Sequence, residues 1–476
     1  MSAVPSDLYW MRRALANSAK AYNFTEARLR QLRKTYTRAI WAIENQIKAF
    51  YTANAEDGKL TPAAVQRIDA QGELTRLEAL HRQIAAELNR LAGAEIKLTG
   101  EVLSDVYAES YYRSIFDVQQ STTVGAVFPR LATAAIDQAI NTAWSGANYS
   151  SRVWKRRDKL AHKVDEIITE GVTLGQSNDK MTRKLADAMD ASYSRASTLI
   201  RTETNYVYNQ GALKGYAAVG VEQYEFLATL DMRTSEQCRM HDGRRFKVSE
   251  AQAGSNYPPL HPNCRSTVIP VMDDGAVGER IARSPEGDQY YVPGDMKYQE
   301  WYDKHVVGQY GAEQAAVYRK QVRNASSDRR QLNQYERLIG DDAPASLEDF
   351  QRMKYTDPAS WAKMQRQAGT FRKINQGQYS DGYKDKLRDN YRYFAQQGHE
   401  FRNHALNRLT GQRTGSDRTP YTREDISRLL AAPPNYKQDD KLIRYRDSTA
   451  IISAADTGEV MTIISRRTVS GNWNEV

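Results

Sequence analysis

Apolar side chains recur at spacings of three and four residues over the first two hundred positions. The first such stripe comprises Leu29, Leu32, Tyr36, Ile40, Ile43, Ile47 and Phe50, and a second comprises Leu74, Leu77, Leu80, Ile84, Leu88 and Leu91. This spacing places apolar groups on one face of a helix. Two stripes across the break "AEDGKLTP" predict a helical hairpin. Packing within the chain is the favoured interpretation, and a partner helix in an oligomer is the alternative.

Further helical patterns follow the hairpin. A helix is predicted over about 129–142, where Pro129 suits the first helical position, and another over 153–170. "VTLGQSND" supplies a glycine stop and a polar restart. The next helix runs through "ASTLIRTETNYVYNQGALKGYAAVG". The first 220 residues are therefore predicted to be a helical region.

The pattern changes to alternation near Val221. "VEQYEFLATLD", "RRFKV" and "CRSTVIPVM" are rich in aromatic and β-branched residues and predict short strands, with "HDGRR" as a turn. From Pro293 the chain is tyrosine-rich and charged, and its helical pieces are separated by polar breaks. That pattern predicts an extended helical linker without a single compact core.

Globular patterning returns in the last eighty residues. "HALNRLTGQ" and "TREDISRLLA" predict helices, the second capped by Thr422 with Asp425 at its third position. "KLIRYRD", "TAIISAAD" and "EVMTIISRR" predict strands. The fold class is therefore predicted to be α+β, with a helical region (1–220), a small β-rich Cys/His module (221–290), an extended helical linker (291–395) and a small C-terminal α+β domain (396–476).

Composition narrows the class of protein. The 476 residues are 40% hydrophobic and 26% charged, with a formal net charge of +9, which is a polar but foldable composition. Two cysteines exclude a disulfide framework and predict a reducing compartment. We see neither a secretory h-region nor eighteen consecutive apolar residues, so no membrane partner is expected.

Both cysteines lie in pairs with histidine. Cys238 and His241 form "CRMH", and His261 and Cys264 form "HPNC" after an intervening nineteen residues. Each x2 spacing lets two ligands reach one ion, so the four residues predict a tetrahedral Cys2His2 zinc site. Prolines around the second pair would hold it in an extended arm. The alternative is that the cysteines are small buried hydrophobic residues and that His261 hydrogen-bonds a backbone carbonyl.

Four ordered motifs resemble one known family. They are "LIRTETNYVYNQGALKGY", "LDMRTSEQCRMH", the turn "DGRRF" and the arm "PPLHPNCRSTVIP". Together they are similar to the head morphogenesis domain of tailed-phage minor head proteins, typified by the Mu F protein. "LYWMRR", "YSSRVW" and "MKYQEWYDK" extend the resemblance over most of the chain. Family members often carry cysteine where this chain has Ser235, His241 or Ser266, which weakens the zinc inference.

The resemblance implies a minor capsid protein of a tailed bacteriophage. Such a protein is expected to be made in the host cytoplasm and to lie inside the virion near the portal vertex, with the portal protein and other capsid or scaffold proteins as partners. Non-specific contact with DNA would agree with the basic balance, and the richest basic stretch outside the module is "YRKQVRNASSDRR", 318–330. A solvated charged helix is the favoured alternative for that stretch.

One helix face of the family motif has a structural interpretation. Arg201, Asn205 and Tyr208 are spaced four and three apart and share a face, while Glu203 points elsewhere. We interpret the three as a clasp between the helix and the Cys/His module. No convergent nucleophile accompanies them.

The C-terminal region raises the question of enzyme activity. "HALNRL", "YTREDISRLLAAP" and "YRDSTAIISAADTGEVMTIISRR" are similar to metal-independent ribonuclease modules of the barnase–EndoU–colicin–RelE superfamily. RNA cleavage needs an acid, a base and cations for the phosphate. His404, Arg408, Arg444 and Thr462 are the candidates to meet over one sheet face, and Arg466 is a further phosphate candidate. Alternatively, His404 and Arg408 simply pack a helix against the sheet.

The sequence therefore supports three candidate functions. The leading one is a minor head protein with a mainly structural role, for which enzyme activity is left open. The second is a phage-borne ribonuclease toxin that uses its C-terminal domain. The third is a zinc-dependent nucleic-acid-binding protein.

Overall fold

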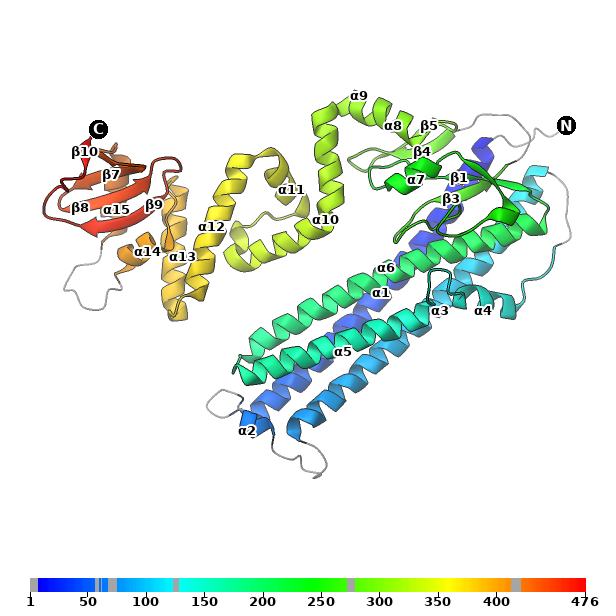
Figure 1. The fold of residues 1–476 in the computed structure, drawn as a ribbon, viewed down its shortest axis with the longest axis horizontal. Helices are drawn as coiled ribbons and strands as arrows, with labels where there is room; N and C mark the ends of the chain where they lie inside the picture. The colour runs from blue at the N-terminus through cyan, green and yellow to red at the C-terminus, as the bar shows by residue number, and fades with distance from the viewer. Residues whose placement is uncertain are drawn as a thin grey trace. The chain divides into compact units, whose positions relative to one another are not determined.

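The chain forms two compact units, Met1–Ala312 (unit 1) and Glu313–Val476 (unit 2) (Figure 1). The structure, a computed structural model, describes residues 7–55, 60, 62–66, 75–122, 128–271, 279–411 and 421–476. Each unit has its own hydrophobic core. The two are therefore described one at a time.

Four long helices lie alongside one another in unit 1 (Figure 1). They are α1 (Asp7–Asn54), α3 (Arg76–Thr122), α5 (Tyr149–Thr173) and α6 (Asn178–Ala218). The short helices α2 (Pro62–Val65) and α4 (Thr133–Asn141) lie in the connections. α3 and α6 share the most extensive contact, and α1 packs against both.

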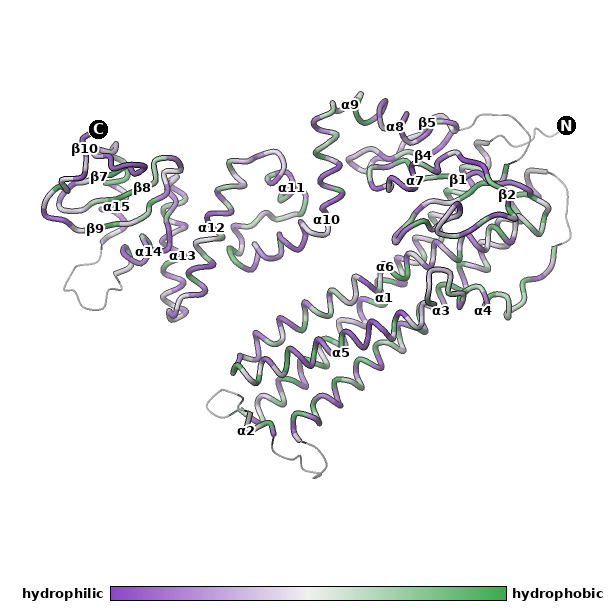
Figure 2. The backbone as a smooth tube through the Cα atoms, viewed as in Figure 1, coloured by the Kyte–Doolittle hydropathy of each residue, from purple (hydrophilic) through white to green (hydrophobic). Residues whose placement is uncertain are grey.

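The predicted hairpin of α1 and α3 is confirmed, and its stripes face the bundle core. Ile43 and Ile47 are 0% and 2% exposed, Leu29, Leu32 and Tyr36 are also buried, and Ile40 and Phe50 are half-buried against the same core. Packing within the chain is thus the correct interpretation for this stripe. Leu74 lies outside the described residues. Hydrophobic positions recur along each long helix between hydrophilic ones (Figure 2), and among the described helices none has the length and apolarity needed to cross a bilayer.

A buried polar layer crosses the bundle and takes one residue from each long helix. The Tyr36 hydroxyl donates to Glu95 Oε2 at 3.1 Å and lies 3.4 Å from Ser192 Oγ. Arg156 forms an ion pair with Glu95, and both side chains are nearly inaccessible. A buried polar group must be paired wherever the helices meet, so this layer favours one register of the four helices.

α3 and α6 approach closely at two glycines. A Cβ added at Gly211 would lie 2.6 Å from Tyr107 O, and one added at Gly215 would lie 2.9 Å from Tyr111 O. Ser110 and Ser114 are the small residues that face them across the contact. The "G-A-L-K-G" run of the family motif is therefore explained by helix packing.

The helix predicted from Pro129 begins later than expected. α4 starts at Thr133, after residues 128–132 in extended or irregular backbone. The carbonyl oxygen of Pro129 accepts a hydrogen bond from the Tyr111 hydroxyl at 2.8 Å. A tertiary contact with α3 thus holds Pro129 outside the helix, which the local pattern did not indicate.

The predicted β-module follows α6. It contains β1 (Gln223–Leu227), α7 (Glu236–His241), β2 (Arg245–Lys247), the 3-10 turn η1 (Val248–Glu250) and β3 (Thr267–Pro270). β1 is central and pairs antiparallel with β2 and β3. A separate antiparallel hairpin, not predicted from the sequence, is formed by β4 (Glu279–Arg283) and β5 (Gln289–Pro293). α8 (Tyr298–Trp301), the π-helical η2 (Tyr302–Val307) and α9 (Gly308–Tyr310) end unit 1.

Unit 2 combines helices with one antiparallel sheet. Its helices are α10 (Ala312–Ile339), η3 (Gly340–Asp342), α11 (Leu347–Thr356), α12 (Pro358–Gln376), α13 (Asp381–Gln396), α14 (Asn403–Thr410) and α15 (Arg423–Ala431). Its strands are β6 (Tyr436–Gln438), β7 (Lys441–Arg446), β8 (Thr449–Ala454), β9 (Val460–Ser465) and β10 (Asn474–Glu475), in the order β10-β6-β7-β8-β9. The α+β class is confirmed.

The segment 291–395 differs from the extended linker that we expected. Its helices α10 to α13 contribute Leu332, Phe350, Phe371 and Phe394 to one core with α14, α15 and the sheet. The sequence pattern did not indicate this core, because polar breaks separate the helices and each helix contributes only a few large side chains to it. The boundary between the two units lies at 312/313, inside the expected linker.

Candidate functional site: the Cys/His group of the β-module

Cys238 is positioned by the start of α7. The Ser235 hydroxyl caps this helix and accepts a hydrogen bond from the Cys238 backbone N–H at 3.2 Å. A serine at the N-cap satisfies an amide that has no partner within the helix. Cys238 is 2% exposed. The cap therefore fixes where the thiol enters the module.

The proline-rich arm places the other two residues. Tyr257 is fully buried, and its hydroxyl donates to Asn209 O of α6 at 2.7 Å. The Cys264 N–H donates to His261 O at 3.1 Å, which closes a turn. Asn263 in that turn has φ +58°, a left-handed conformation that asparagine tolerates. The turn brings His261 and Cys264 to the same side of the arm.

Cys238, His261 and Cys264 converge. Cys238 Sγ lies 3.2 Å from His261 Nε2 and 3.6 Å from Cys264 Sγ, and the three ligand atoms lie within 4.8 Å of one another. Both thiols are buried and unbridged, and the imidazole is half-buried. The predicted clustering is therefore confirmed for these three residues.

The two thiols are not equivalent. A hydrogen bond from Cys238 lowers the pKa of Cys264 to about 4, burial opposes this shift, and His261 adds to it. The same contact with Cys264, together with burial, raises the pKa of Cys238. Hydrogen bonding with Cys264 raises the pKa of His261 against the effect of burial. The group therefore combines two cysteine sulfurs with an imidazole nitrogen, which are donors that a soft divalent metal prefers.

His241, the fourth predicted ligand, lies outside this group. Its Nδ1 is 2.8 Å from Gln237 O, one helical turn earlier. Its ring lies near Phe226 and Phe246, at centroid distances of 5.5 and 6.3 Å. The x2 spacing on α7 predicted that Cys238 and His241 would face one ion. In the folded module the imidazole is held by its own helix and by aromatic rings instead.

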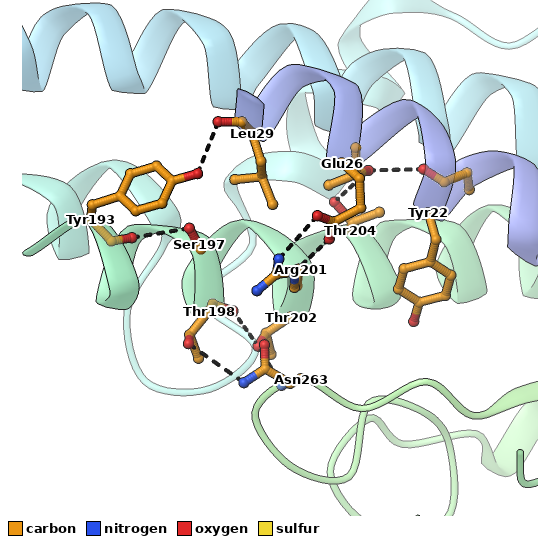
Figure 3. Close-up of polar contacts among 12 residues, drawn as sticks. Tyr22, Glu26, Leu29, Tyr193, Ser197, Thr198, Arg201, Thr202, Thr204 and Asn263 are labelled. Carbon is orange, nitrogen blue, oxygen red and sulfur yellow. Dashed lines mark hydrogen bonds and ion pairs between the residues drawn. The ribbon is translucent and has the colours of Figure 1, made fainter. Parts of the chain in front are cut away.

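Threonine hydroxyl groups of α6 hold the proline-rich arm at Asn263 (Figure 3). The Asn263 backbone N–H donates to Thr202 Oγ1 at 2.9 Å, and Thr202 Oγ1 donates to Thr198 O at 2.7 Å. On the neighbouring turn, Arg201 forms a bidentate ion pair with Glu26 of α1, at 2.6 and 3.0 Å. Arg201 therefore ties α6 to α1 rather than to the module.

The predicted clasp is confirmed at Asn205. Its side-chain amide donates to Ser266 O at 2.9 Å and to the Tyr22 hydroxyl at 2.7 Å. Tyr22 in turn donates to Cys264 O at 2.8 Å. The carbonyl groups on both sides of Arg265 are thus held by α6 and α1. Tyr208 donates to Ala14 O of α1 at 3.3 Å and also forms a side-chain hydrogen bond with Thr267 of β3, and Glu203 points away toward Trp144.

Two ion pairs brace the site, and our sequence reasoning missed both. Arg265 donates to Asp231 at 2.7 Å beside Cys264. Asp242 and Arg280, both nearly inaccessible, form a bidentate contact at 3.0 Å. Asp242 also accepts from the backbone N–H groups of Ala228 and Tyr298, at 2.9 and 3.1 Å. Asp231 was noted only as part of a predicted strand and a family motif, and Asp242 only as part of a turn.

The C-terminal candidates do not share one sheet face. Across β7, β8 and β9, Arg444 is directly opposite Ile451, and Ile451 is opposite Ile463. Thr462 belongs to the next row, in which it is opposite Ile452, and Ile452 is opposite Ile443. Since neighbouring residues on a strand point to opposite faces, Arg444 and Thr462 lie on opposite faces. Arg444 Nε donates to Ala432 O just after α15, on the face covered by helices. The expectation of a common face for all four residues is therefore wrong.

The other candidates occupy different surroundings. His404 is exposed and Arg408 half-buried on α14, and Arg466 lies over the Trp473 ring at 5.4 Å on the opposite face from Arg444. His399, which the sequence analysis did not select, is half-buried, and burial together with the charge of Arg444 lowers its pKa. A lone histidine before "EFRNH" carried no motif that could have identified it.

The site lies in a part of the chain that matches a known protein family. Residues 162–269 match the family described as "Phage Mu protein F like protein". The match runs from within α5 to β3, so it includes the clasp of α6, Cys238 and the arm with His261 and Cys264. The resemblance to phage head morphogenesis proteins is confirmed for this domain. It leaves the nuclease resemblance of residues 396–476 untested.

Two curated proteins show a more distant similarity. The NAD(+)–arginine ADP-ribosyltransferase EFV of Enterococcus faecalis (strain ATCC 700802 / V583) is 26% identical over 312 residues, which cover 62% of this chain and 61% of that protein. An uncharacterized protein of Haemophilus influenzae (strain ATCC 51907 / DSM 11121 / KW20 / Rd) is 25% identical over 118 residues, 25% of this chain and 26% of that one. The chain thus spans about three fifths of the first relative and about a quarter of the second. No solved structure matches.

Proposed function

We propose that this protein is a minor head component of a tailed bacteriophage that acts at the portal vertex during head assembly. The observation that carries the proposal is the phage Mu protein F-like match over 162–269. The matched residues include those that make the clasp, Asn205 and Ser266 among them, so the motif is bound to the bundle rather than appended to it. A rigid unit of this kind suits a structural role in an assembly.

The portal protein is the proposed partner, with other capsid or scaffold proteins nearby. The α1 stripe around Ile43 and Ile47 is excluded as the contact because both side chains are buried within the chain. Exposed aromatic residues on the bundle are available for it, notably Trp41 at 67% and Trp154 at 42% exposed. Large aromatic side chains are frequent anchors of protein interfaces.

Mass spectrometry of purified virions and procapsids tests this function. We expect the chain in both particles at a low copy number relative to the major capsid protein. Particles assembled without the portal protein should lack it. Its absence from both particles, with the protein abundant in the lysate, would overturn the proposal.

We further propose that Cys238, His261 and Cys264 hold zinc. Ligands at about 2.3 Å (sulfur) and 2.0 Å (nitrogen) from a tetrahedral zinc ion lie about 3.8 Å apart for two sulfurs and about 3.5 Å apart for sulfur and nitrogen. The two separations here are 3.6 and 3.2 Å, so a small outward shift would fit the ion. Bound zinc would tie α7 to the arm and so stabilise the module.

The ribonuclease function remains a second candidate for unit 2. The helices and strands expected there are present. Incubating the full chain with RNA in EDTA tests it. Cleavage that is lost in Arg444→Ala and kept in Thr462→Ala would place the reaction on the helix-covered face. RNA left intact by the wild-type protein would refute the candidate.

A further inference from the structure

The α10 helix of unit 2 presents cations on its solvent side. Five residues within twelve positions are exposed there, namely Arg319, Lys320, Arg323, Arg329 and Arg330. Arg323 and Arg330 are seven residues apart and so lie on the same stripe of the helix. Between them the exposed positions include Ser326 and Ser327, which carry no charge. We call these seven residues the basic face of α10.

The one carboxylate in this stretch is turned inward. Asp328 is five residues from Arg323 and therefore lies on the opposite side of the helix, where it is 0% exposed. Its oxygens accept hydrogen bonds from Lys354 Nζ at 2.7 Å, Gln351 Nε2 at 2.9 Å and Tyr355 Oη at 2.8 Å. The negative charge is thus neutralised by α11 and cannot neutralise the basic face.

The segment is helical, as the interpretation of a charged helix expected. All of "YRKQVRNASSDRR" lies within the 28-residue helix α10. The Asp328 contacts explain this, because they fasten the middle of the helix to α11. The cations are therefore displayed on a rigid rod, about 16 Å long from Arg319 to Arg330 at the usual helical rise.

The charge of the whole protein is concentrated in the same unit. Residues 313–476 contain 28 lysines and arginines and 21 aspartates and glutamates, a net charge of +7, out of +9 for the chain. Residues 1–312 contain 39 and 37, a net charge of +2. Unit 2 therefore attracts a polyanion more strongly than unit 1, which contains the phage Mu F-like domain.

We propose that the basic face of α10 binds the phosphate backbone of duplex DNA. Duplex DNA carries one charge per about 1.7 Å of axis, so several cations along a 16 Å rod meet several phosphates at once. The basic face contains no aromatic side chain on which an unpaired base could stack, so a duplex fits it better than a single strand. Binding is independent of base sequence, because the contacts are to phosphates. The proposal concerns residues outside 162–269 and is independent of the proposed head function.

Titration of a short labelled duplex with the full-length chain at several salt concentrations tests the proposal. The test variant carries Lys320→Gln, Arg323→Gln and Arg330→Gln, which keep good helix formers on the surface. The matched control carries Lys363→Gln, Lys373→Gln and Lys386→Gln, three exposed lysines of α12 and α13 with the same total charge. The slope of log affinity against log salt should flatten by up to about 2.7 in the test variant, at about 0.9 per phosphate lost. It should stay at the wild-type value in the control.

A second variant adds negative charge without removing any cation. Ser326→Asp together with Ser327→Asp places two carboxylates on the basic face and should weaken binding at least tenfold at low salt. Equal slopes for the test and control variants would overturn the proposal. Competition by polyglutamate as effective, per charge, as unlabelled DNA would also overturn it, because the face would then be a site for acidic proteins.

Discussion

Glu203 of the family motif is a carboxylate inside unit 1. It is 3% exposed and accepts a hydrogen bond from Trp144 Nε1 at 2.9 Å. Burial raises its pKa, and the Trp144 hydrogen bond and the charge of Arg152 oppose that rise. Because its pKa is higher in the folded state, the folded protein holds this proton more tightly than the unfolded chain does. The free energy of unfolding therefore falls as pH rises from below the ordinary glutamate range to above the raised value.

Replacement of Glu203 by glutamine should remove that pH-dependent penalty. Glutamine keeps the acceptor for Trp144 and carries no charge. We expect the variant to be more stable than the wild type at pH 7, by on the order of 1 kcal/mol, and equally stable near pH 3. Urea unfolding followed by circular dichroism at both pH values measures this, with Glu101→Gln, an exposed change on α3, as the control. A variant that is less stable than wild type at pH 7 would show that the carboxylate is needed in its charged form.

The proposed zinc site makes a prediction that separates its three ligands from His241. The purified protein should contain about one zinc per chain, and Cys264→Ser should lose most of it because two ligands bind zinc far more weakly than three. His241→Ala should retain zinc, since its imidazole lies outside the group. Metal content measured by mass spectrometry gives the answer. Zinc lost from the His241 variant as well would mean that α7 turns this side chain inward when metal binds.

At the scale of helices, the contact between α3 and α6 depends on the absence of side chains. A methyl group at Gly211 would meet the backbone oxygen of Tyr107 at 2.6 Å, and backbone cannot rotate out of the way as a side chain can. Gly211→Ala should therefore separate the two helices and destabilise unit 1 by about 1–3 kcal/mol, the usual cost of overpacking.

A second glycine in the same pair of helices provides the control. Gly93 lies within α3 and has no atom within 4 Å of an added Cβ. Gly93→Ala should stabilise the helix by about 0.5–1 kcal/mol, because alanine loses less conformational freedom on folding. Thermal unfolding of the two variants should shift in opposite directions. A Gly211 variant as stable as the Gly93 variant would mean that the helices do not approach this closely.

At the scale of the whole molecule, two cores predict two unfolding transitions. Ile200 belongs to the core of unit 1 and Phe371 to the core of unit 2, and each is 0% exposed. Truncating a buried side chain of this size to alanine costs about 2–5 kcal/mol. In calorimetry, Ile200→Ala should lower one transition and Phe371→Ala the other. If each variant shifted both transitions together, the units would unfold as one.

Much of this fold was predictable because it depends on residues that are close together in the sequence. The stripe from Leu29 to Phe50 determines which side of α1 is buried, since helical periodicity alone fixes that face. The cap at Thr422, whose hydroxyl accepts from the Asp425 N–H at 3.1 Å, and the strands of the last eighty residues follow from the same kind of local signal. The prolines of the arm likewise exclude a helix at any position in the fold.

Residue spacing also indicated which residues of the module come together. It selected Cys238, His261 and Cys264 correctly and His241 wrongly, and Asn205 was selected from its helix face. These predictions required only that the proline-rich arm pack back against α7 and α6. Prolines restrict the backbone of the arm, so few conformations of it are available. Ser266 and Tyr22 could not be paired with Asn205 in advance, because the chain separates them by 61 and 183 residues.

The orientation of individual side chains was decided only by tertiary structure. His241 turns to its own helix and to Phe226, and the β7–β8–β9 register places Arg444 and Thr462 on opposite faces. The core of 291–395 and the burial of Asp328 likewise depend on which helices meet. A local pattern specifies periodicity and caps, which involve neighbours a few residues away. Register, side-chain direction and the partner of a buried charge depend on residues far along the chain, and only the packed fold brings those together.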